Sequence, residues 1–150
     1  MDRRDFLLAG AGAVAGAVAS GAVAGRAVAD EHHGGAAAAP SPTAAFTAAA
    51  SGCLDAGNTC LEHALKHLAE GDKSLGECAI AVHQMLAVCQ AAAVIAPTDS
   101  KYKKTLVQLC RDVCADCETA CRKHEKHHAE CKACAEACAV TQKEAAKLLA

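Results

Sequence analysis

The sequence has few large apolar side chains with which to build a conventional core. Its 150 residues include no Trp, one Tyr and two Phe, so aromatic residues make up only 2% of the chain. Between Asp30 and Ala150, Leu, Val, Ile and Phe together account for about 16% of the residues, below the roughly 20% at which disorder becomes a serious interpretation. Disorder also requires a high net charge, which this chain lacks at -2. Other residues must therefore fill the core.

The chain also lacks an excess of basic residues. Its 15 Lys and Arg face 17 Asp and Glu, which leaves no basic surface for nucleic acid or for an anionic membrane. No Ser/His/Asp pattern, phosphate-binding loop or convincing pair of acid and base carboxylates is present. We therefore expect no nucleic-acid partner and a binding function without catalysis, so the protein is not expected to be an enzyme.

What the sequence does contain is eleven cysteines. Many are spaced by three, four or seven residues, and this spacing keeps side chains on one face of an α-helix. Free cysteine is a small hydrophobe that is commonly buried, so cysteines and alanines together can fill the core. The cysteines are Cys53, Cys60, Cys78, Cys89, Cys110, Cys114, Cys117, Cys121, Cys131, Cys134 and Cys138.

The pattern of caps and helix breakers predicts four helices. We expect them at about 43–70, closed by a glycine, at 72–96, stopped by a proline, at 100–122 and at 129–149. The polar segment 123–128 is predicted to be a turn, and no stretch alternates with the period of a strand. Short connections then predict an all-α fold, an antiparallel up-down four-helix bundle with a cysteine-lined core.

Antiparallel packing sorts the candidate ligands by height along this bundle. One end is predicted to hold Cys53, Cys89, Cys110 and Cys138. The other end is predicted to hold Cys78, Cys121 and Cys131. The middle is predicted to hold Cys60, Met85, Cys114, Cys117 and Cys134. His63 and His67 continue the cysteine stripe of the first helix by steps of three and four. With the loop histidines His124, His127 and His128, they are expected to form a mouth at the Cys78 end.

Two features of the first two helices need a packing explanation. Gly52 and Gly57 lower helix propensity, which indicates close backbone packing or a local kink. Met85 could be a soft-metal ligand, but it lies among Val82, Leu86 and alanines. It is therefore interpreted as ordinary core.

Disulfide bonds are the first alternative for so many cysteines in an exported chain. The odd number leaves at least one thiol unpaired, and cysteines three or four apart on a helix have Cβ atoms about 5–6 Å apart, too far for the roughly 3.5–4.5 Å of a disulfide. Interhelical bridges remain open, and they would make the protein a disulfide-linked helical-hairpin structural or chaperone module.

Among metals, a continuous ladder of thiols favours Cu(I). Structural zinc usually takes four ligands that close one tetrahedron, whereas thiolates select Cu(I) and can bridge it along a row. Burying many uncompensated thiolates would be prohibitive, but each Cu(I) that replaces a thiol proton leaves the charge of the core unchanged. The ladder therefore predicts that multiple Cu(I) ions are bound per chain.

The N-terminus resembles a twin-arginine export signal. Arg3 and Arg4 precede Phe6, and an Ala, Gly and Val run leads to the cleavage motif at 27–29. We expect residues 1–29 to be a removed signal peptide and the protein to be periplasmic or otherwise extracytoplasmic. A retained anchor at 6–25 is the alternative, because about 20 residues can span a bilayer, although this run is only weakly apolar.

Residues 30–43 show no periodicity and are expected to be a flexible leader before the copper-binding bundle at 44–150. Within this leader, His32 and His33 are interpreted as solvated side chains rather than ligands.

The helical stripes and export signal resemble those of the copper storage proteins, a cysteine-rich four-helix-bundle family. The most specific part is the run Cys131-Lys132-Ala133-Cys134-Ala135-Glu136-Ala137-Cys138, preceded by Asp112-Val113-Cys114-Ala115-Asp116-Cys117. The resemblance implies Cu(I) storage inside the bundle, homotetramers, and partners among cuproenzymes or copper chaperones. It implies as ligands all the cysteines except Cys110, with His63 at the mouth.

The sequence departs from this family pattern in three places. Thr141 and Ala145 stand where the ladder of the last helix would continue, and Ala64 stands one turn past Cys60. Cys110 extends the ladder of the third helix in partial compensation. We therefore expect a lower copper capacity than in members richer in cysteine.

Overall fold

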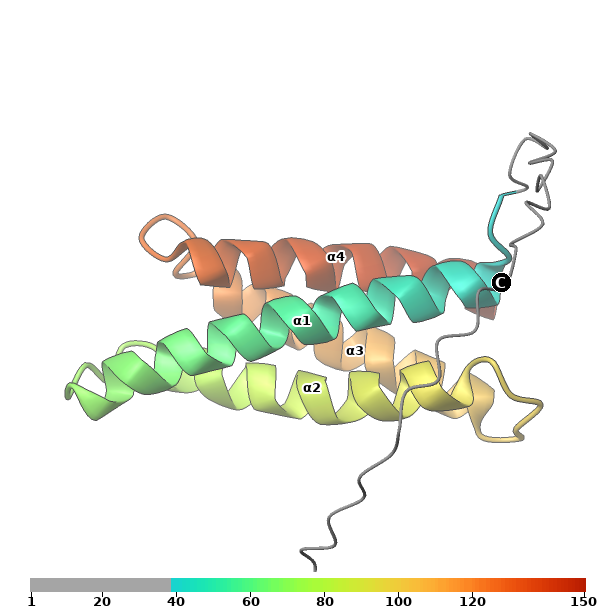
Figure 1. Cartoon of the computed structure of the whole chain (residues 1–150), viewed down its shortest axis with the longest axis horizontal. Helices are drawn as coiled ribbons and strands as arrows, with labels where there is room; N and C mark the ends of the chain where they lie inside the picture. Colours follow the sequence, from blue (N-terminus) through green and yellow to red (C-terminus); the bar gives the residue numbers. More distant parts are fainter. Residues whose placement is uncertain (1–38) are drawn as a thin grey trace, which may run out of the picture. The chain divides into compact units, whose positions relative to one another are not determined.

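The computed structural model describes residues 39–150, and these form four α-helices without a β-strand. The helices are α1 (Pro42–Ala69), α2 (Gly76–Ile95), α3 (Lys103–Arg122) and α4 (Ala129–Leu149), and consecutive helices run antiparallel (Figure 1). The predicted all-α bundle is confirmed. The predicted signal peptide, His32, His33 and most of the predicted leader lie outside the described residues.

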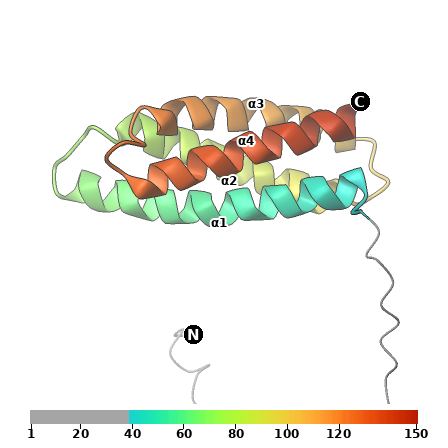
Figure 2. The ribbon, with the colours of Figure 1, turned by 90° about the horizontal axis from the view of Figure 1, so that it is seen from above.

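Each helix packs against two neighbours. α1 and α3 both contact α2 and α4, while the diagonal pairs make no backbone contact, as the two views of the bundle show (Figures 1 and 2). The α1–α2 and α3–α4 connections lie together at one end, and the α2–α3 connection lies at the other. This square arrangement leaves one central core toward which all four helices can direct side chains.

Both ends of α1 carry recognisable helix signals. Ser41 Oγ accepts a hydrogen bond from the Ala44 backbone N–H at 3.2 Å, and Pro42 occupies the first turn. At the other end Gly71 has φ +90°, and the Asp72 N–H donates to the His67 carbonyl at 3.0 Å. This glycine stop reverses the chain just after His67 and fixes that histidine at one end of the bundle.

Two predicted helix starts are wrong by about three or four residues. Asp72 does not cap α2, which begins at Gly76; its carboxylate instead accepts from the Ser74 N–H in a local turn at 2.9 Å. Ser100 likewise accepts from the Tyr102 N–H at 3.2 Å, and α3 begins at Lys103. In both places a short polar side chain stabilises a turn instead of opening a helix.

Only one of the two glycines in α1 has a packing reason. A Cβ on Gly57 would lie 2.7 Å from Met85 Cε and 2.9 Å from Leu86 Cδ2. The predicted close packing is therefore confirmed there. A Cβ on Gly52 would have no neighbouring atom within 4 Å, and nothing in the structure explains this glycine.

One described helix, α2, is long and apolar enough to cross a membrane by length and composition alone, with a mean hydropathy of 1.8. Its cysteines and Met85 face the bundle core, where they are fully buried. A helix that lines a protein core passes the same test, so the apolar character of α2 has a structural explanation within the bundle.

Candidate metal centre

All eleven cysteines face the centre of the bundle as free thiols. Each of them has no exposed surface. The core therefore consists largely of sulfur, with one aromatic residue, Phe46, among the described buried residues.

Five thiols lie close together in the half of the core nearer the α2–α3 connection. Cys89 Sγ is 3.2 Å from Cys110 Sγ and 3.5 Å from Cys114 Sγ. Cys53 Sγ is 3.5 Å from Cys138 Sγ, and Cys53, Cys114 and Cys138 form a set of mutually close sulfurs. Cys114 thus belongs to both groups and connects them.

The other six thiols occupy the half nearer the α1–α2 and α3–α4 connections. Cys78 Sγ lies 3.3 Å from Cys121 Sγ and 3.9 Å from Cys131 Sγ. Cys60 Sγ is 4.0 Å from Cys78 Sγ and 3.8 Å from Cys131 Sγ. Cys117 Sγ lies 3.8 Å from Cys134 Sγ and 4.0 Å from Cys121 Sγ.

The sulfur sets draw their members from different helices. Sets of three whose sulfurs all lie within 4.8 Å of one another include Cys60, Cys78 and Cys131; Cys60, Cys121 and Cys134; Cys53, Cys114 and Cys138; and Cys89, Cys110 and Cys114. Two sulfurs bound to one ion by bonds of about 2.3 Å, the length found in zinc–thiolate sites, stand at most about 4.6 Å apart. The observed sulfur separations are thus suited to shared metal ions.

The predicted order of the thiols along the bundle agrees with these contacts at both ends. Two of the thiols assigned to the middle are displaced outward: Cys114 contacts Cys89 near one end, and Cys60 contacts Cys78 and Cys131 near the other. A count of residues from the helix ends does not include the offsets between neighbouring helices, so it could not place these two thiols.

The thiols share protons along the ladder. A hydrogen bond from Cys114, followed by one from Cys89, lowers the pKa of Cys110 to about 5. Hydrogen bonds with Cys117 and Cys134 raise the pKa of Cys121, while bonds from Cys117 and Cys121 lower the pKa of Cys134. Hydrogen bonds between neighbouring thiols thus lower the pKa of some sulfurs and raise that of others.

A cluster of histidines lies at one end of this ladder, where the α1–α2 and α3–α4 connections meet. His63 Nε2 is 2.8 Å from His128 Nδ1, and His63, His67 and His128 form a set that could hold a metal ion. The rings of His63 and His67 are 4.6 Å apart, and those of His67 and His128 are 5.2 Å apart. Burial, then the neighbouring histidines, lower the pKa of His128, which keeps its imidazole neutral and able to bind metal.

Sequence reasoning grouped the three loop histidines without distinguishing them. The structure brings only His128 into contact with His63 and His67; His124 is farther away, with its ring 6.3 Å from that of His128, and His127 is exposed. His128 directly precedes α4, and its position at a helix start was the signal available in the sequence.

Two carboxylates also face this cluster and were missed by the sequence analysis. Glu130 lies 3.6 Å from His63 Nδ1, and Asp72 lies 3.5 Å from His67 Nδ1. Each can hold the ring nitrogen that a metal would not use, as carboxylates beside metal-binding histidines commonly do.

The opposite end of the core contains no sulfur beyond Cys110 and Cys138. Buried apolar side chains fill it, together with Thr141, whose Oγ1 donates to the carbonyl oxygens of Ala49 and Ala137 at 3.1 and 3.0 Å. Ala145, one turn farther, is also buried. The ladder therefore ends inside the bundle at a closed, non-ligating end.

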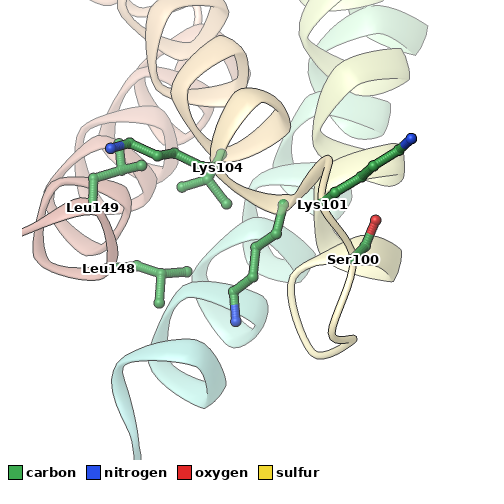
Figure 3. Close-up of a pocket in the computed structure, with 7 residues that line it drawn as sticks. Ser100, Lys101, Lys104, Leu148 and Leu149 are labelled. Atoms are coloured by element: carbon green, nitrogen blue, oxygen red, sulfur yellow. The ribbon is translucent and has the colours of Figure 1, made fainter.

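A surface pocket at this closed end does not belong to the centre. It is lined by Ser100, Lys101, Lys103, Lys104, Val107, Leu148 and Leu149. Figure 3 shows the Lys101 side chain directed away from Leu148 and Leu149. The pocket has neither thiol nor imidazole, so the histidine end is the only end of the described bundle at which metal ligands approach the surface.

Comparison with known proteins relates this architecture to copper proteins. The family model of the copper storage proteins matches residues 39–150. The uncharacterized cysteine-rich protein YhjQ of Bacillus subtilis (strain 168) is 38% identical over 79 residues, which cover 52% of this chain and 65% of that protein. The chain thus spans slightly less than two thirds of this curated relative.

Two solved structures are similar over most of the described bundle. The copper storage protein Ccsp of Streptomyces lividans, loaded with 10 copper equivalents, is 27% identical with a TM-score of 0.66, over 72% of this chain and 83% of that chain. The Cu(I)-bound copper storage protein BsCsp3 is 29% identical with a TM-score of 0.66, over 73% of this chain and 100% of that chain.

Proposed function

The chain belongs to the copper storage protein family, and on that premise we propose that it stores multiple Cu(I) ions on the thiolates of its bundle core. The observation that carries the proposal is the placement of eleven buried, free thiols on four helices, with neighbouring sulfurs 3.2–4.0 Å apart. The proposed role is to buffer copper for cuproenzymes or against copper toxicity, without catalysis.

The chemistry of the core suits a monovalent soft ion. Protonated thiols pack as small apolar groups, so the bundle can fold before metal arrives. Each Cu(I) ion that replaces one thiol proton leaves the net charge of the core unchanged, whereas a divalent ion must replace two thiol protons to do so, so the same thiols would hold fewer divalent ions. Many Cu(I) ions can therefore enter the same buried space without the cost of buried net charge.

The histidine cluster is proposed to be the site where copper enters. His63, His67 and His128 are partly exposed, and they stand at the same end as the thiols of Cys78 and Cys131. Neutral imidazoles bind Cu(I) without the loss of a proton, so they can hold an ion briefly before thiolates deeper in the bundle take it. Glu130 and Asp72 orient the rings of His63 and His67 for this role.

Export by the twin-arginine route and a homotetrameric assembly belong to the same proposal. Support for export is the arginine pair at Arg3 and Arg4 before a weakly apolar run. Support for assembly is the outer face of α2, where Ile80 and Val94 are 63% and 58% exposed and no charged residue follows Glu77 within the helix. Fractionation of the native host and light scattering of the purified protein test the two points.

A competition titration tests the central proposal. Fully reduced protein is titrated anaerobically with Cu(I) in the presence of a chromophoric Cu(I) chelator, and bound copper is measured per chain. We expect the chelator to remain free of copper until several ions per chain have been bound. Saturation at one or two ions would rule out storage and indicate a single structural or transport site.

A further inference from the structure

Met85 supplies the one sulfur of the described core that does not belong to a cysteine. It is fully buried on α2, one turn before Cys89. On the facing helix α1, Gly57 occupies the position between Cys53 and Cys60. The wall formed by α1 and α2 therefore has a thioether where the cysteine spacing of α3 and α4 provides thiols.

The sulfur of Met85 is directed at the thiol ladder. Cys53 Sγ donates a hydrogen bond to Met85 Sδ at 3.4 Å; a thioether can only accept, so the proton in this contact belongs to Cys53. Cys53 Sγ is also 3.5 Å from Cys138 Sγ. One thiol thus links a thioether and a second thiol, and the three sulfurs come from α2, α1 and α4.

The contact with Gly57 fixes this orientation. The Met85 methyl group lies so close to α1 that a Cβ at position 57 would be 2.7 Å from it. Methionine has three rotatable bonds and can fill irregular gaps in many ways. Here the methyl group is held against the α1 backbone, which turns the sulfur lone pairs toward Cys53.

We propose that Met85 Sδ is a metal ligand that forms, with Cys53 and Cys138, a mixed thioether and dithiolate site for one Cu(I) ion in the half of the core nearer the α2–α3 connection. This inference rests on the proposed storage of Cu(I), and it replaces the sequence-based interpretation of Met85 as ordinary core. Thiolate and thioether sulfurs are both soft donors that select Cu(I). Met85 Sδ is thus an additional donor sulfur that a count of cysteines does not include.

The neutral third donor has a consequence for charge. When one Cu(I) ion binds to Cys53 and Cys138, two Cu–S bonds form and the two thiol protons are released to solvent. With Met85 as the third donor the site carries one negative charge, whereas a third thiolate would give it two. Since buried net charge is costly, a thioether allows three-coordinate copper in this fully buried part of the core.

Selenium provides a direct test, because the chain contains only two methionines, Met1 and Met85. The full chain is produced with selenomethionine, loaded stepwise with Cu(I), and studied by X-ray absorption at the selenium edge. Met85→Leu is the matched background: it conserves volume and retains selenium only at position 1. Circular dichroism of both empty proteins verifies that they are folded.

We expect a selenium–copper scattering shell in the loaded parent chain that is absent from Met85→Leu. Met85→Leu should also lose one tightly held Cu(I) ion per chain in competition with a chelator. Copper-loaded parent protein whose selenium has only carbon neighbours would overturn the Met85 site while leaving storage intact. An equal shell in the leucine variant would assign it to position 1 and overturn the site as well. A parent chain that binds no copper would overturn the proposed function itself.

Discussion

Replacing Thr141 by cysteine should extend the thiol ladder by one position. Thr141 is fully buried on α4 and lies three residues after Cys138, whose sulfur contacts Cys53. A cysteine at 141 adds one thiol with one exchangeable proton next to this pair. We therefore expect Thr141→Cys to withhold about one more Cu(I) ion per chain from a competing chelator, since each thiolate gained on proton release adds a ligand.

The same substitution should weaken the empty protein slightly. Thr141 Oγ1 donates a hydrogen bond that is shared between the carbonyls of Ala49 and Ala137, and a hydrogen bond of this kind contributes about 0.5–1.5 kcal/mol net. Both carbonyls lie within helices, so their backbone partners remain. We expect the free energy of unfolding to fall by about 1 kcal/mol, which corresponds to roughly 2–8 °C in Tm for a domain of this size.

Thr141→Val separates these two effects, because valine has the same shape but neither sulfur nor hydroxyl. It should lower Tm about as much as the cysteine variant and leave the copper capacity at the parent value. Anaerobic Cu(I) titration and thermal denaturation of the empty proteins provide the two measurements. Equal copper capacities in the cysteine and valine variants would refute the argument that the ladder stops at Cys138 for want of a ligand.

The remaining predictions concern the thiols, the mouth and the glycine contacts. Anaerobically purified protein that is denatured with a thiol reagent should show all eleven cysteines as free thiols; one or three would support interhelical disulfides instead. His128→Ala should slow Cu(I) uptake in stopped-flow measurements without changing the final capacity, whereas exposed His127→Ala should change neither, and equal slowing in both would contradict the role of the mouth. Because burial lowers the pKa of His128, its imidazole should lose its ability to bind metal only when the pH falls below the ordinary value of about 6.5, and a plot of uptake rate against pH checks this. Gly52→Ala meets no neighbour and should increase stability by up to about 1 kcal/mol. Gly57→Ala gains the same helix propensity but must displace the Met85 methyl group from a Cβ 2.7 Å away, so chemical denaturation should show it to be less stable than Gly52→Ala.

The helices and their inward faces could be predicted because the cysteine spacing repeats the helical period. The bounds of α4, Ala129–Leu149, agree with the prediction, since a polar segment precedes the helix and a continuous stripe runs through it. The starts of α2 and α3 could not be placed, because Asp72 and Ser100 are equally suited to a turn and to a helix cap. Tertiary packing decides between these two uses, and a single sequence does not contain it.

The contacts of individual side chains were less predictable than the bundle. The partnership of His63 with His128 depends on how the α3–α4 connection closes, and only the position of His128 directly before α4 distinguished it from His124 and His127. The role of Met85 depends on a 3.4 Å contact to Cys53 and on the missing side chain of Gly57. Spacing shows which face of a helix a residue occupies, but not which atom on the next helix it reaches.

Cys60 and Cys114 each belong to two of the sulfur triads, and this sharing couples the filling of neighbouring positions. Once one ion has removed the proton from a shared sulfur, the next ion meets a thiolate that is already formed and already held in place. Copper should then accumulate in runs along the axis instead of scattering among independent positions. A half-loaded sample would then consist largely of nearly empty and nearly full molecules. The core would thus bind copper cooperatively and not as a set of independent sites.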